Sequence, residues 1–399
     1  MAYGEVPEQK GPLLEGRDTV TAPIRSVHID IEGGFGGSSR SLFELVSRLD
    51  RDKVCPLVIC RTKGPIQQRY EDIGIKAIHV PEIYSFAPRD RNNWKIFAVT
   101  APRLLKLRKA VQKIVQATVE HRAQIVHLNY EGLFLLGTQL RRQLDLPIVG
   151  HSRTRIPSNL WGRWEARTLA GLVSHMFYIS PEERDAFLHH AHVSGDVIWN
   201  IAAAPPQKPT FPKDPVAVYL GNIDYEKGAD RLIDVAAELE NQKAMPQLRI
   251  AVFGSARSGT NFLEDLRDQV KARGLTDRIE FKGHTPYPER ELQSALCLLR
   301  VSRWNDPWGR DVIEATRSGI PALATGTTNA VIEHQKTGYL FADFDASQIA
   351  STMIDLATNA EKWQEISDCA TRKGEEMFSG KQQVDRVMKV FTALTSEES

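Results

Sequence analysis

Short apolar runs alternate along this chain with longer stretches in which apolar residues recur every three or four positions. The short runs are nearly continuous in apolar character, which is typical of strands buried on both faces of a parallel sheet. In the first half, strands are predicted at residues 26–31, 54–60, 77–80, 124–129, 147–152, 175–180 and 196–201. In the second half, they are predicted at residues 216–222, 248–254, 279–283, 297–302 and 321–325. Helices between such strands indicate an α/β protein with doubly wound parallel sheets.

A proline cluster at residues 204–215 separates two halves of similar organisation. Proline interrupts helices and central strands, so this stretch is the predicted linker between an N-terminal domain (25–203) and a C-terminal domain (216–380). Residues 1–200 carry 27 Lys and Arg against 21 Asp and Glu, whereas the remainder carries 24 against 29. Ligands of doubly wound sheets bind at the carboxyl ends of the strands, so the site is expected in the cleft between the two domains.

Composition permits two folded cores and excludes several other classes of protein. The chain has 399 residues, 42% of them hydrophobic, and a formal net charge of +1, which does not indicate a nucleic-acid-binding protein. The chain contains no run of 18 apolar residues, so no membrane-spanning helix is predicted. The first 24 residues are polar and lack the apolar core of a secretory signal, so we expect a disordered tail there. The cysteines lack metal-site spacing and are interpreted as reduced core thiols of a cytoplasmic protein. They are Cys55, Cys60, Cys297 and Cys369.

Residues 301–333 contain the pattern most typical of a ligand site. Asp306 precedes a tight Pro307-Trp308-Gly309 segment, and seven residues separate it from Glu314, which falls in the first turns of a predicted helix. The N-terminus of a helix presents unpaired N–H groups and the positive end of its dipole, and both attract a diphosphate. The Glu314 carboxylate is suited to accept hydrogen bonds from two neighbouring ribose hydroxyls. An ordinary strand, loop and helix with Asp306 as the N-cap is the alternative interpretation.

The spacing of Asp306 and Glu314 resembles the hallmark of retaining glycosyltransferases of family 4, which have the GT-B fold and usually carry Glu at the first position. Residues 221–239 resemble the second motif of this family, in which an Arg and a Lys neutralise the donor diphosphate. Lys227 matches the lysine, but Asn222 stands where the arginine is expected and offers only a dipole. The candidates for a substitute cation are Arg153, Arg155, Arg303 and Arg310.

Two segments of the first half extend the resemblance. The glycine-rich loop at residues 33–42 places Gly36 and Gly37 where the family has a loop that admits the donor diphosphate and the acceptor. A flexible turn is the alternative interpretation of this loop. His151 follows an apolar strand, as does the histidine that contacts the donor sugar in this family. Considered alone, a histidine at such a position is more often structural or solvated.

The resemblance covers residues 25–395 and implies two Rossmann-like domains that face each other across a cleft, with a helix at residues 381–399 returning to the N-terminal domain. It implies transfer of a sugar from a UDP- or GDP-sugar to a hydroxyl of a glycan, glycolipid or small molecule. The reaction would retain the anomeric configuration and need no metal or other cofactor. The implied catalytic residues are His151, Asp306 and Lys227. The implied donor-binding residues are Gly36, Gly37, Asn222, Lys227, Trp308, Gly309, Arg310 and Glu314.

Departures from the family pattern leave a second hypothesis open, a catalytically impaired GT-B protein that binds or scaffolds nucleotide sugars or glycans. Asn222 motivates it, as does the absence of the family's Gly-Gly pair from residues 327–333. The retained Asp306, Lys227 and Glu314 argue against it. Release of free nucleotide diphosphate from a donor distinguishes the two hypotheses.

Basic residues concentrate at residues 89–122, where nine Lys and Arg stand against one Asp and one Glu. Within this segment residues 102–117 are amphipathic. The segment either contacts an anionic membrane or an acidic acceptor, or forms an ordinary helix with a basic, solvated face. Aromatic residues do not interleave with the basic ones, so no nucleic-acid partner is expected. The protein is therefore expected in the cytoplasm, free or peripheral at the inner face of the membrane.

Overall fold

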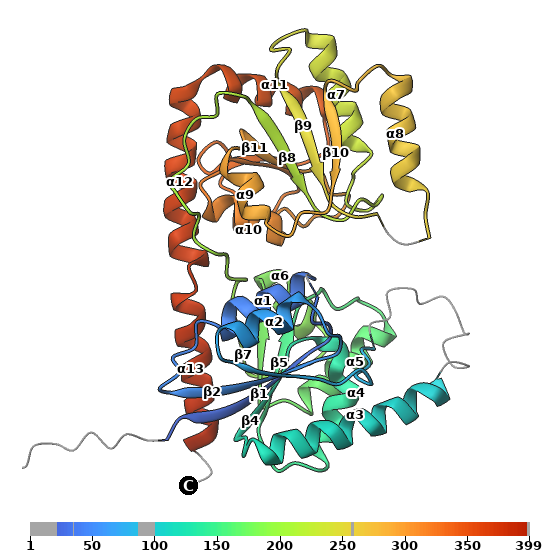
Figure 1. The fold of residues 1–399 in the computed structure, drawn as a ribbon, viewed down its shortest axis with the longest axis vertical. Helices are drawn as coiled ribbons and strands as arrows, with labels where there is room; N and C mark the ends of the chain where they lie inside the picture. The colour runs from blue at the N-terminus through green and yellow to red at the C-terminus, as the bar shows by residue number, and fades with distance from the viewer. Residues whose placement is uncertain (1–21, 35, 87–99, 257–258, 397–399) are drawn as a thin grey trace, which may run out of the picture.

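The computed structural model describes residues 22–34, 36–86, 100–256 and 259–396, with the backbone alone described for residues 100–105. These residues form two parallel sheets, one built from each half of the chain and each flanked by helices (Figure 1). The predicted α/β class with two doubly wound sheets is therefore confirmed. Most of the predicted tail, residues 1–24, lies outside the described residues.

The first sheet has the strand order β3-β2-β1-β4-β5-β6-β7, with every neighbouring pair parallel. Its strands are β1 (Ile24–Asp30), β2 (Val54–Cys60), β3 (Lys76–His79), β4 (Ile125–Leu128), β5 (Ile148–Ser152), β6 (His175–Tyr178) and β7 (Gly195–Val197). Its helices are α1 (Gly37–Val46), α2 (Pro65–Asp72), α3 (Thr100–Glu120), α4 (Phe134–Arg141), α5 (Leu160–Ala170) and α6 (Pro181–Leu188). One face packs on α3, α4 and α5, and the other on α1 and α2, so the sheet has two separate apolar cores.

The second sheet has the order β10-β9-β8-β11-β12-β13 and is also parallel throughout. Its strands are β8 (Val216–Leu220), β9 (Arg249–Phe253), β10 (Ile279–Gly283), β11 (Cys297–Arg300), β12 (Ala322–Thr325) and β13 (Gly338–Phe341). Its helices are α7 (Arg231–Gln242), α8 (Phe262–Ala272), α9 (Pro288–Gln293), α10 (Arg310–Arg317), α11 (Ala346–Thr358) and α12 (Ala360–Phe378). One continuous apolar core holds these elements together, with the buried Trp363 among its largest members.

The chain crosses between the sheets twice. The first crossing is the proline-rich stretch between β7 and β8, which contains neither helix nor strand. The second lies between α12 and α13 (Lys381–Ser396), and Gly380 occupies the left-handed region there with φ +102°. Val387 and Phe391 of α13 are buried in the same core as the α1 and α2 side chains. The last helix therefore completes the apolar core on one face of the first sheet (Figure 1).

The predicted strands agree with the observed ones to within a few residues, but β13 was not predicted. Its four residues follow a polar stretch and lie at the edge of the sheet, so a short run gives little periodicity to recognise. The prediction of four core thiols is only half right, because Cys60 and Cys297 are buried while Cys55 and Cys369 are partly exposed. All four cysteines are free.

The basic segment forms α3, whose apolar side is already in use. Leu107, Val111 and Ile114 are buried against the first sheet, whereas Lys106 and Lys109 face solvent. Among the described helices, none combines the length and apolar character needed to cross a bilayer. Contact between α3 and a membrane would therefore depend on its charges.

We expect a variant in which Lys106, Arg108 and Lys109 are changed to Gln to bind anionic liposomes more weakly, by about fivefold for each charge removed. The effect should disappear at high salt, because these charges are exposed. Co-sedimentation at low ionic strength measures it. The matched control changes three exposed lysines of the other domain, Lys243, Lys271 and Lys282. A wild-type protein that does not bind such liposomes at low salt would identify α3 as an ordinary surface helix.

Candidate active site

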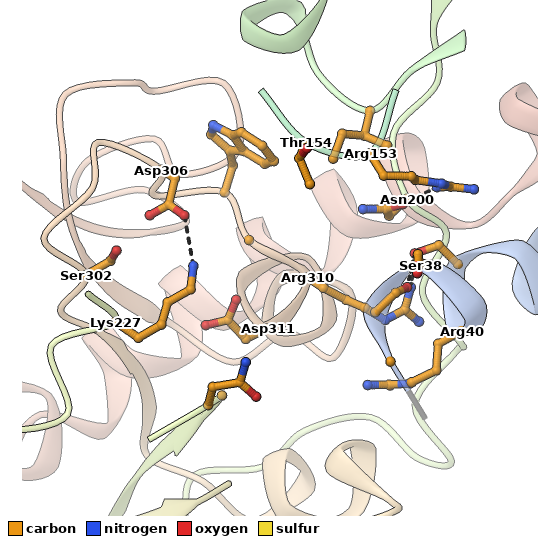
Figure 2. A pocket seen from close by; sticks show the side chains of 18 of the residues that line it. Ser38, Arg40, Arg153, Thr154, Asn200, Lys227, Ser302, Asp306, Arg310 and Asp311 are labelled. Carbon is orange, nitrogen blue, oxygen red and sulfur yellow. Dashed lines mark hydrogen bonds and ion pairs between the residues drawn. The ribbon is translucent and has the colours of Figure 1, made fainter. Parts of the chain in front are cut away.

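A cleft with a cavity volume of about 1190 Å³ lies between the two sheets. The residues that line it follow the carboxyl ends of strands in both halves, such as Glu131 after β4, Asn222 after β8 and Ser302 after β11. This is where doubly wound sheets bind their ligands. Figure 2 shows charged side chains from both halves converging on it.

The loop between β11 and α10 forms one wall of the cleft. Gly309 is the N-cap of α10 and provides no side-chain cap, so the first N–H groups of the helix have no side-chain acceptor at the cap position. Asp306 is therefore not the N-cap, which corrects the alternative interpretation of this segment. Its Oδ2 atom lies 3.1 Å from Lys227 Nζ and 2.7 Å from Arg300 Nη2. Its Oδ1 atom is buried and has no hydrogen-bond partner among the described residues.

Lys227 is aimed into the cleft by the turn that follows it (Figure 2). Gly228 adopts φ +74°, and a Cβ at this position would lie 2.1 Å from the carbonyl oxygen of Val301. Only glycine allows both the conformation and this close approach to the end of β11. The backbone N–H of Lys227 donates to Asp224 Oδ1 at 2.7 Å, and its Nζ lies 4.8 Å from the centre of the Trp304 ring. Local geometry thus explains the glycine of the Lys-Gly motif.

Glu314 lines the cleft but is already paired with two arginines. Its Oε1 atom lies 2.5 Å from Arg40 Nη2 and 2.9 Å from Arg310 Nε. Arg310 Nη1 in turn donates to Ser41 Oγ at 2.8 Å. Because Arg40 and Ser41 belong to α1, these contacts join the two halves of the molecule across the cleft.

The glycine loop before α1 lines the opposite wall. A Cβ on Gly36 would lie 1.8 Å from Glu32 Oε2, so the Glu32 carboxylate rests against the Gly36 backbone. Burial and the nearby Asp30 raise the pKa of Glu32. Gly37 has open space around its Cα, and residue 35 between the glycine pairs lies outside the described residues. Both predicted glycines are therefore at the cleft.

The turn after β5 is fixed by buried polar contacts. Arg153 donates through Nε and Nη2 to Asn129 Oδ1 at 3.1 and 2.6 Å, and through Nη1 to Asn200 Oδ1 at 2.9 Å. Burial lowers the pKa of Arg153 to about 9. Glu131 accepts the backbone N–H of Arg153 at 2.8 Å and the hydroxyl of Thr154. These bonds hold Arg153 and Thr154 at the surface of the cleft.

His151 is not among the residues that line the cleft, and its predicted role at the donor sugar stays a prediction. His151 is 2% exposed and its ring packs against His127 and Phe177, with ring centres 5.6 and 5.9 Å apart. Strand β5 continues through Ser152, so His151 lies within the sheet, and the residues that reach the cleft begin at Arg153. Burial lowers the pKa of His151 well below its ordinary value.

Most of the remaining predicted site residues and candidate cations line the cleft. Asn222, Trp308 and Arg310 line the cleft. Three of the four candidate cations, Arg153, Arg155 and Arg310, also line it, but Arg303 does not. Arg303 instead forms a bidentate pair with Asp230 at 2.8 and 2.6 Å. Within the part of the chain that the structure describes, no group of three or more His, Cys, Asp or Glu side chains is arranged to hold a metal ion.

Sequence reasoning missed two arginines that the structure brings to the cleft, Arg40 and Arg300. Arg300 is buried, and although burial alone would lower its pKa, Asp311 and Asp306 raise the pKa above the usual range of arginine. A charged residue that ends an apolar strand immediately before a ligand motif is the signal that marks Arg300. Arg40 follows the glycine loop by a few residues and resembles an ordinary solvent-facing position of a helix.

Known proteins share this sequence pattern and architecture. The family profile described as "Glycosyltransferase Family 4" matches residues 35–201, and "Glycosyl transferases group 1" matches residues 200–373. Mannosylfructose-phosphate synthase of Agrobacterium fabrum is 29% identical over 170 residues, 41% of this chain and 37% of the relative. D-inositol 3-phosphate glycosyltransferase of Nocardia farcinica is 29% identical over 166 residues, 40% of this chain and 37% of the relative. Both alignments thus span well under half of the relative's own length.

Solved structures share the fold over almost the whole chain. The Anabaena protein HepE in complex with UDP-glucose matches with a TM-score of 0.74 and 19% identity, over 93% of this chain and 100% of that one. Sucrose-phosphate synthase of Thermosynechococcus elongatus matches with a TM-score of 0.73 and 16% identity, over 94% and 100% of the two chains. The arrangement of two parallel sheets is therefore shared with proteins of low sequence identity.

Proposed function

Since this chain belongs to the family 4 glycosyltransferases and has the GT-B fold, we propose that it transfers a sugar from a nucleotide-diphosphate donor to an acceptor hydroxyl. The observation that carries the proposal is the wall of the cleft formed by Lys227, Asp306 and the uncapped N-terminus of α10. It combines a fixed cation, the positive end of a helix and a carboxylate, which suit a sugar diphosphate. The Anabaena protein HepE contains UDP-glucose in its solved structure, which supports a UDP-sugar as the first donor to test.

In this proposal the C-terminal half binds the donor. The diphosphate lies against the N-terminus of α10 and Lys227, and Glu314 accepts hydrogen bonds from the ribose hydroxyls. The unpartnered Oδ1 atom of Asp306 accepts a hydrogen bond from a hydroxyl of the donor sugar. The glycine loop with Gly36 and Gly37, together with Thr154, faces this donor from the other half and bounds the space for the acceptor.

The proposed reaction proceeds with retention of configuration by attack from the face of the leaving group. The bond between the anomeric carbon and the phosphate oxygen breaks, and the acceptor oxygen bonds to the anomeric carbon on the same face. The proton of the acceptor hydroxyl passes to the departing phosphate oxygen. Lys227 and the dipole of α10 stabilise the negative charge that develops on the phosphate, and this is the contribution that preorganised charges make to catalysis. These charges belong to the protein, so we propose that no metal ion is required.

A donor screen tests the proposed function. UDP- and GDP-sugars are incubated with the protein and a panel of acceptor hydroxyls in the presence of EDTA, and release of free UDP or GDP is measured. We expect release from at least one donor, with an unchanged rate when EDTA replaces a divalent cation, and an α-linked product from an α-linked donor. Tight binding of a nucleotide sugar without release would instead identify a binding or scaffolding protein.

We expect Glu314→Gln to weaken the affinity for the nucleotide diphosphate by about 10- to 100-fold, because hydrogen bonds to a charged acceptor contribute about 1.5–3 kcal/mol. Titration calorimetry with the nucleotide measures it. Glu314 also pairs with Arg40 and Arg310, so a small decrease in melting temperature is expected as well.

Two comparisons separate ribose binding from a structural role of Glu314. Arg40→Ala removes a competitor for the Glu314 carboxylate and should leave the nucleotide affinity equal or higher. Glu365→Gln, at an exposed position of α12, should change neither affinity nor stability. A large loss of stability in Glu314→Gln with unchanged nucleotide affinity would contradict the assignment.

A further inference from the structure

Arg300 ends β11 beneath the loop that carries Asp306. Its Nε atom donates to the backbone carbonyl of Asp306 at 2.7 Å, and its Nη2 atom donates to Asp306 Oδ2 at 2.7 Å. Its Nη1 atom donates to Asp311 Oδ1 at 2.6 Å. A guanidinium group has five N–H donors, so two remain without a partner among the described residues. The side chain is only 8% exposed, yet it belongs to the lining of the cleft.

The position of this guanidinium explains why residue 309 is a glycine. Gly309 has φ −53°, a value open to any residue, so its backbone conformation does not require glycine. A Cβ at this position, however, would lie 2.2 Å from Arg300 Nη1 and 2.4 Å from Arg300 Cζ. The guanidinium therefore occupies the space that a side chain at residue 309 would take. It lies directly at the N-cap of α10, where the helix dipole already favours an anion.

Strand pairing brings the same guanidinium to the end of β8. Strands β8 and β11 are hydrogen-bonded neighbours with Leu298 opposite Val218. Continued by two residues, this register sets Arg300 level with Leu220, the last residue of β8, so Asn222 follows just beyond. Arg300 and Lys227 also share one atom, because both contact Asp306 Oδ2, at 2.7 and 3.1 Å. Two fixed cations therefore converge at the N-cap of α10.

Three other arginines of the cleft (Arg40, Arg310 and Arg153) are engaged elsewhere, whereas Arg155 is exposed. Arg310 pairs with Glu314 and donates to Ser41 on the opposite wall. Arg153 is held by Asn129 and Asn200 in the other half of the molecule. Among the cleft-lining arginines, Arg300 is the one that shares a carboxylate with Lys227.

We propose that Arg300 supplies the second fixed positive charge on the donor diphosphate, in place of the arginine that the resemblance led us to expect at Asn222. The inference rests on the proposed function and identifies a residue of the same site. The charge comes from the neighbouring strand rather than from the loop that contains Lys227. In this arrangement Asp306 and Asp311 hold the guanidinium in place, and Gly309 leaves room for it.

The test removes the positive charge at residue 300 and returns it at residue 222. If Arg300 had only a structural role, a new arginine at residue 222 would not restore diphosphate binding. Arg300→Gln/Asp311→Asn removes the cation together with one of its carboxylates, so that fewer charges are left unpaired. We expect this variant to bind UDP (or GDP, if the wild type prefers it) about 10- to 100-fold more weakly. Binding of the corresponding nucleoside, uridine or guanosine, should change by less than about twofold, because it carries no phosphate. Adding Asn222→Arg to this variant should raise its diphosphate affinity again by at least about tenfold.

Each outcome decides the inference. Asn222→Arg in an otherwise wild-type protein should give little gain in diphosphate affinity, because Arg300 already provides the charge, and a melting curve for every variant verifies folding. Equal loss of nucleoside and diphosphate affinity, or no restoration by Asn222→Arg, would identify Arg300 as a structural residue and overturn the inference. If Arg300→Gln/Asp311→Asn does not fold, Gly309→Ala, which displaces the guanidinium, gives the same comparison. A wild-type protein that binds neither UDP nor GDP would overturn the proposed function and this inference with it.

Discussion

Replacement of Lys227 by alanine is expected to lower the turnover rate by about 100- to 1,000-fold, the typical cost of removing one preorganised charge from a transition state. Lys227 lines the cleft, and its Nζ atom lies 3.1 Å from Asp306 Oδ2 in the loop that leads into α10. Its side chain is 25% exposed and its partner Asp306 is 22% exposed, so solvent screens their attraction. The substitution should therefore change the melting temperature little.

Initial rates of nucleotide release at saturating donor and acceptor measure this effect. Lys271→Ala, at an exposed position of α8, removes the same charge far from the cleft and should leave the rate unchanged. Addition of Asn222→Arg to Lys227→Ala should recover part of the lost rate, because it returns a cation to the same region. A Lys227→Ala enzyme that retains more than about a tenth of the wild-type rate would remove Lys227 from the mechanism.

The second large effect concerns stability in acid. His28, His127 and His151 are buried side by side across β1, β4 and β5, and His28 Nδ1 lies 3.1 Å from His127 Nδ1. Burial lowers the pKa of His28 from 6.5 to about 3, and it lowers those of His127 and His151 as well. Below pH 6.5 the unfolded chain therefore binds protons that the folded chain excludes. The free energy of unfolding should fall by about 3 kcal/mol from His28 alone between pH 6.5 and pH 4.

Urea unfolding at a series of pH values measures this loss. Glu183 acts in the opposite direction, because burial raises its pKa from 4.5 to about 7, so the folded chain binds the extra proton between these values. Burial also raises the pKa values of Asp30 and Glu32 and lowers those of His121 and His175. The five histidines together should keep the net slope of stability against pH positive. His28→Gln should reduce the slope of stability against pH, whereas His192→Gln, at an exposed position, should not. Equal slopes in the wild type and His28→Gln would show that His28 is not the group that titrates.

Local patterns made the fold and one wall of the cleft predictable. Apolar runs and a proline cluster are properties of consecutive residues, and they were sufficient to predict two parallel sheets. The turn at Lys227 and Gly228 was found through the resemblance to the family motif, and its geometry depends on a glycine adjacent to the functional side chain. The same holds for the loop from Asp306 to Glu314, where a strand, a tight segment and a helix follow one another directly.

Residues whose role depends on distant partners were not predictable. Arg300 reaches the cleft because β8 and β11 are neighbours, and this pairing joins segments about 80 positions apart. Arg40 meets Glu314 across a separation of 274 residues. The burial of His151 was not predictable, because its position after an apolar run does not reveal that β5 continues through Ser152. A sequence pattern shows which residues lie near the end of a strand. Whether each of them reaches the cleft or stays buried within the sheet depends on packing.

The packing of α13 on the first sheet affects the order in which this protein can fold during synthesis. Val387 and Phe391 are buried beside side chains of α1 and α2, which leave the ribosome more than three hundred residues earlier. Domains usually fold as they emerge, the N-terminal one first. Here the face of the N-terminal sheet on which α1 and α2 pack lacks its last covering helix until the whole second domain has been made. During that interval we expect the nascent chain to expose the apolar surface that α13 later covers, and a ribosome that stops before α13 would release a first domain with that surface still exposed.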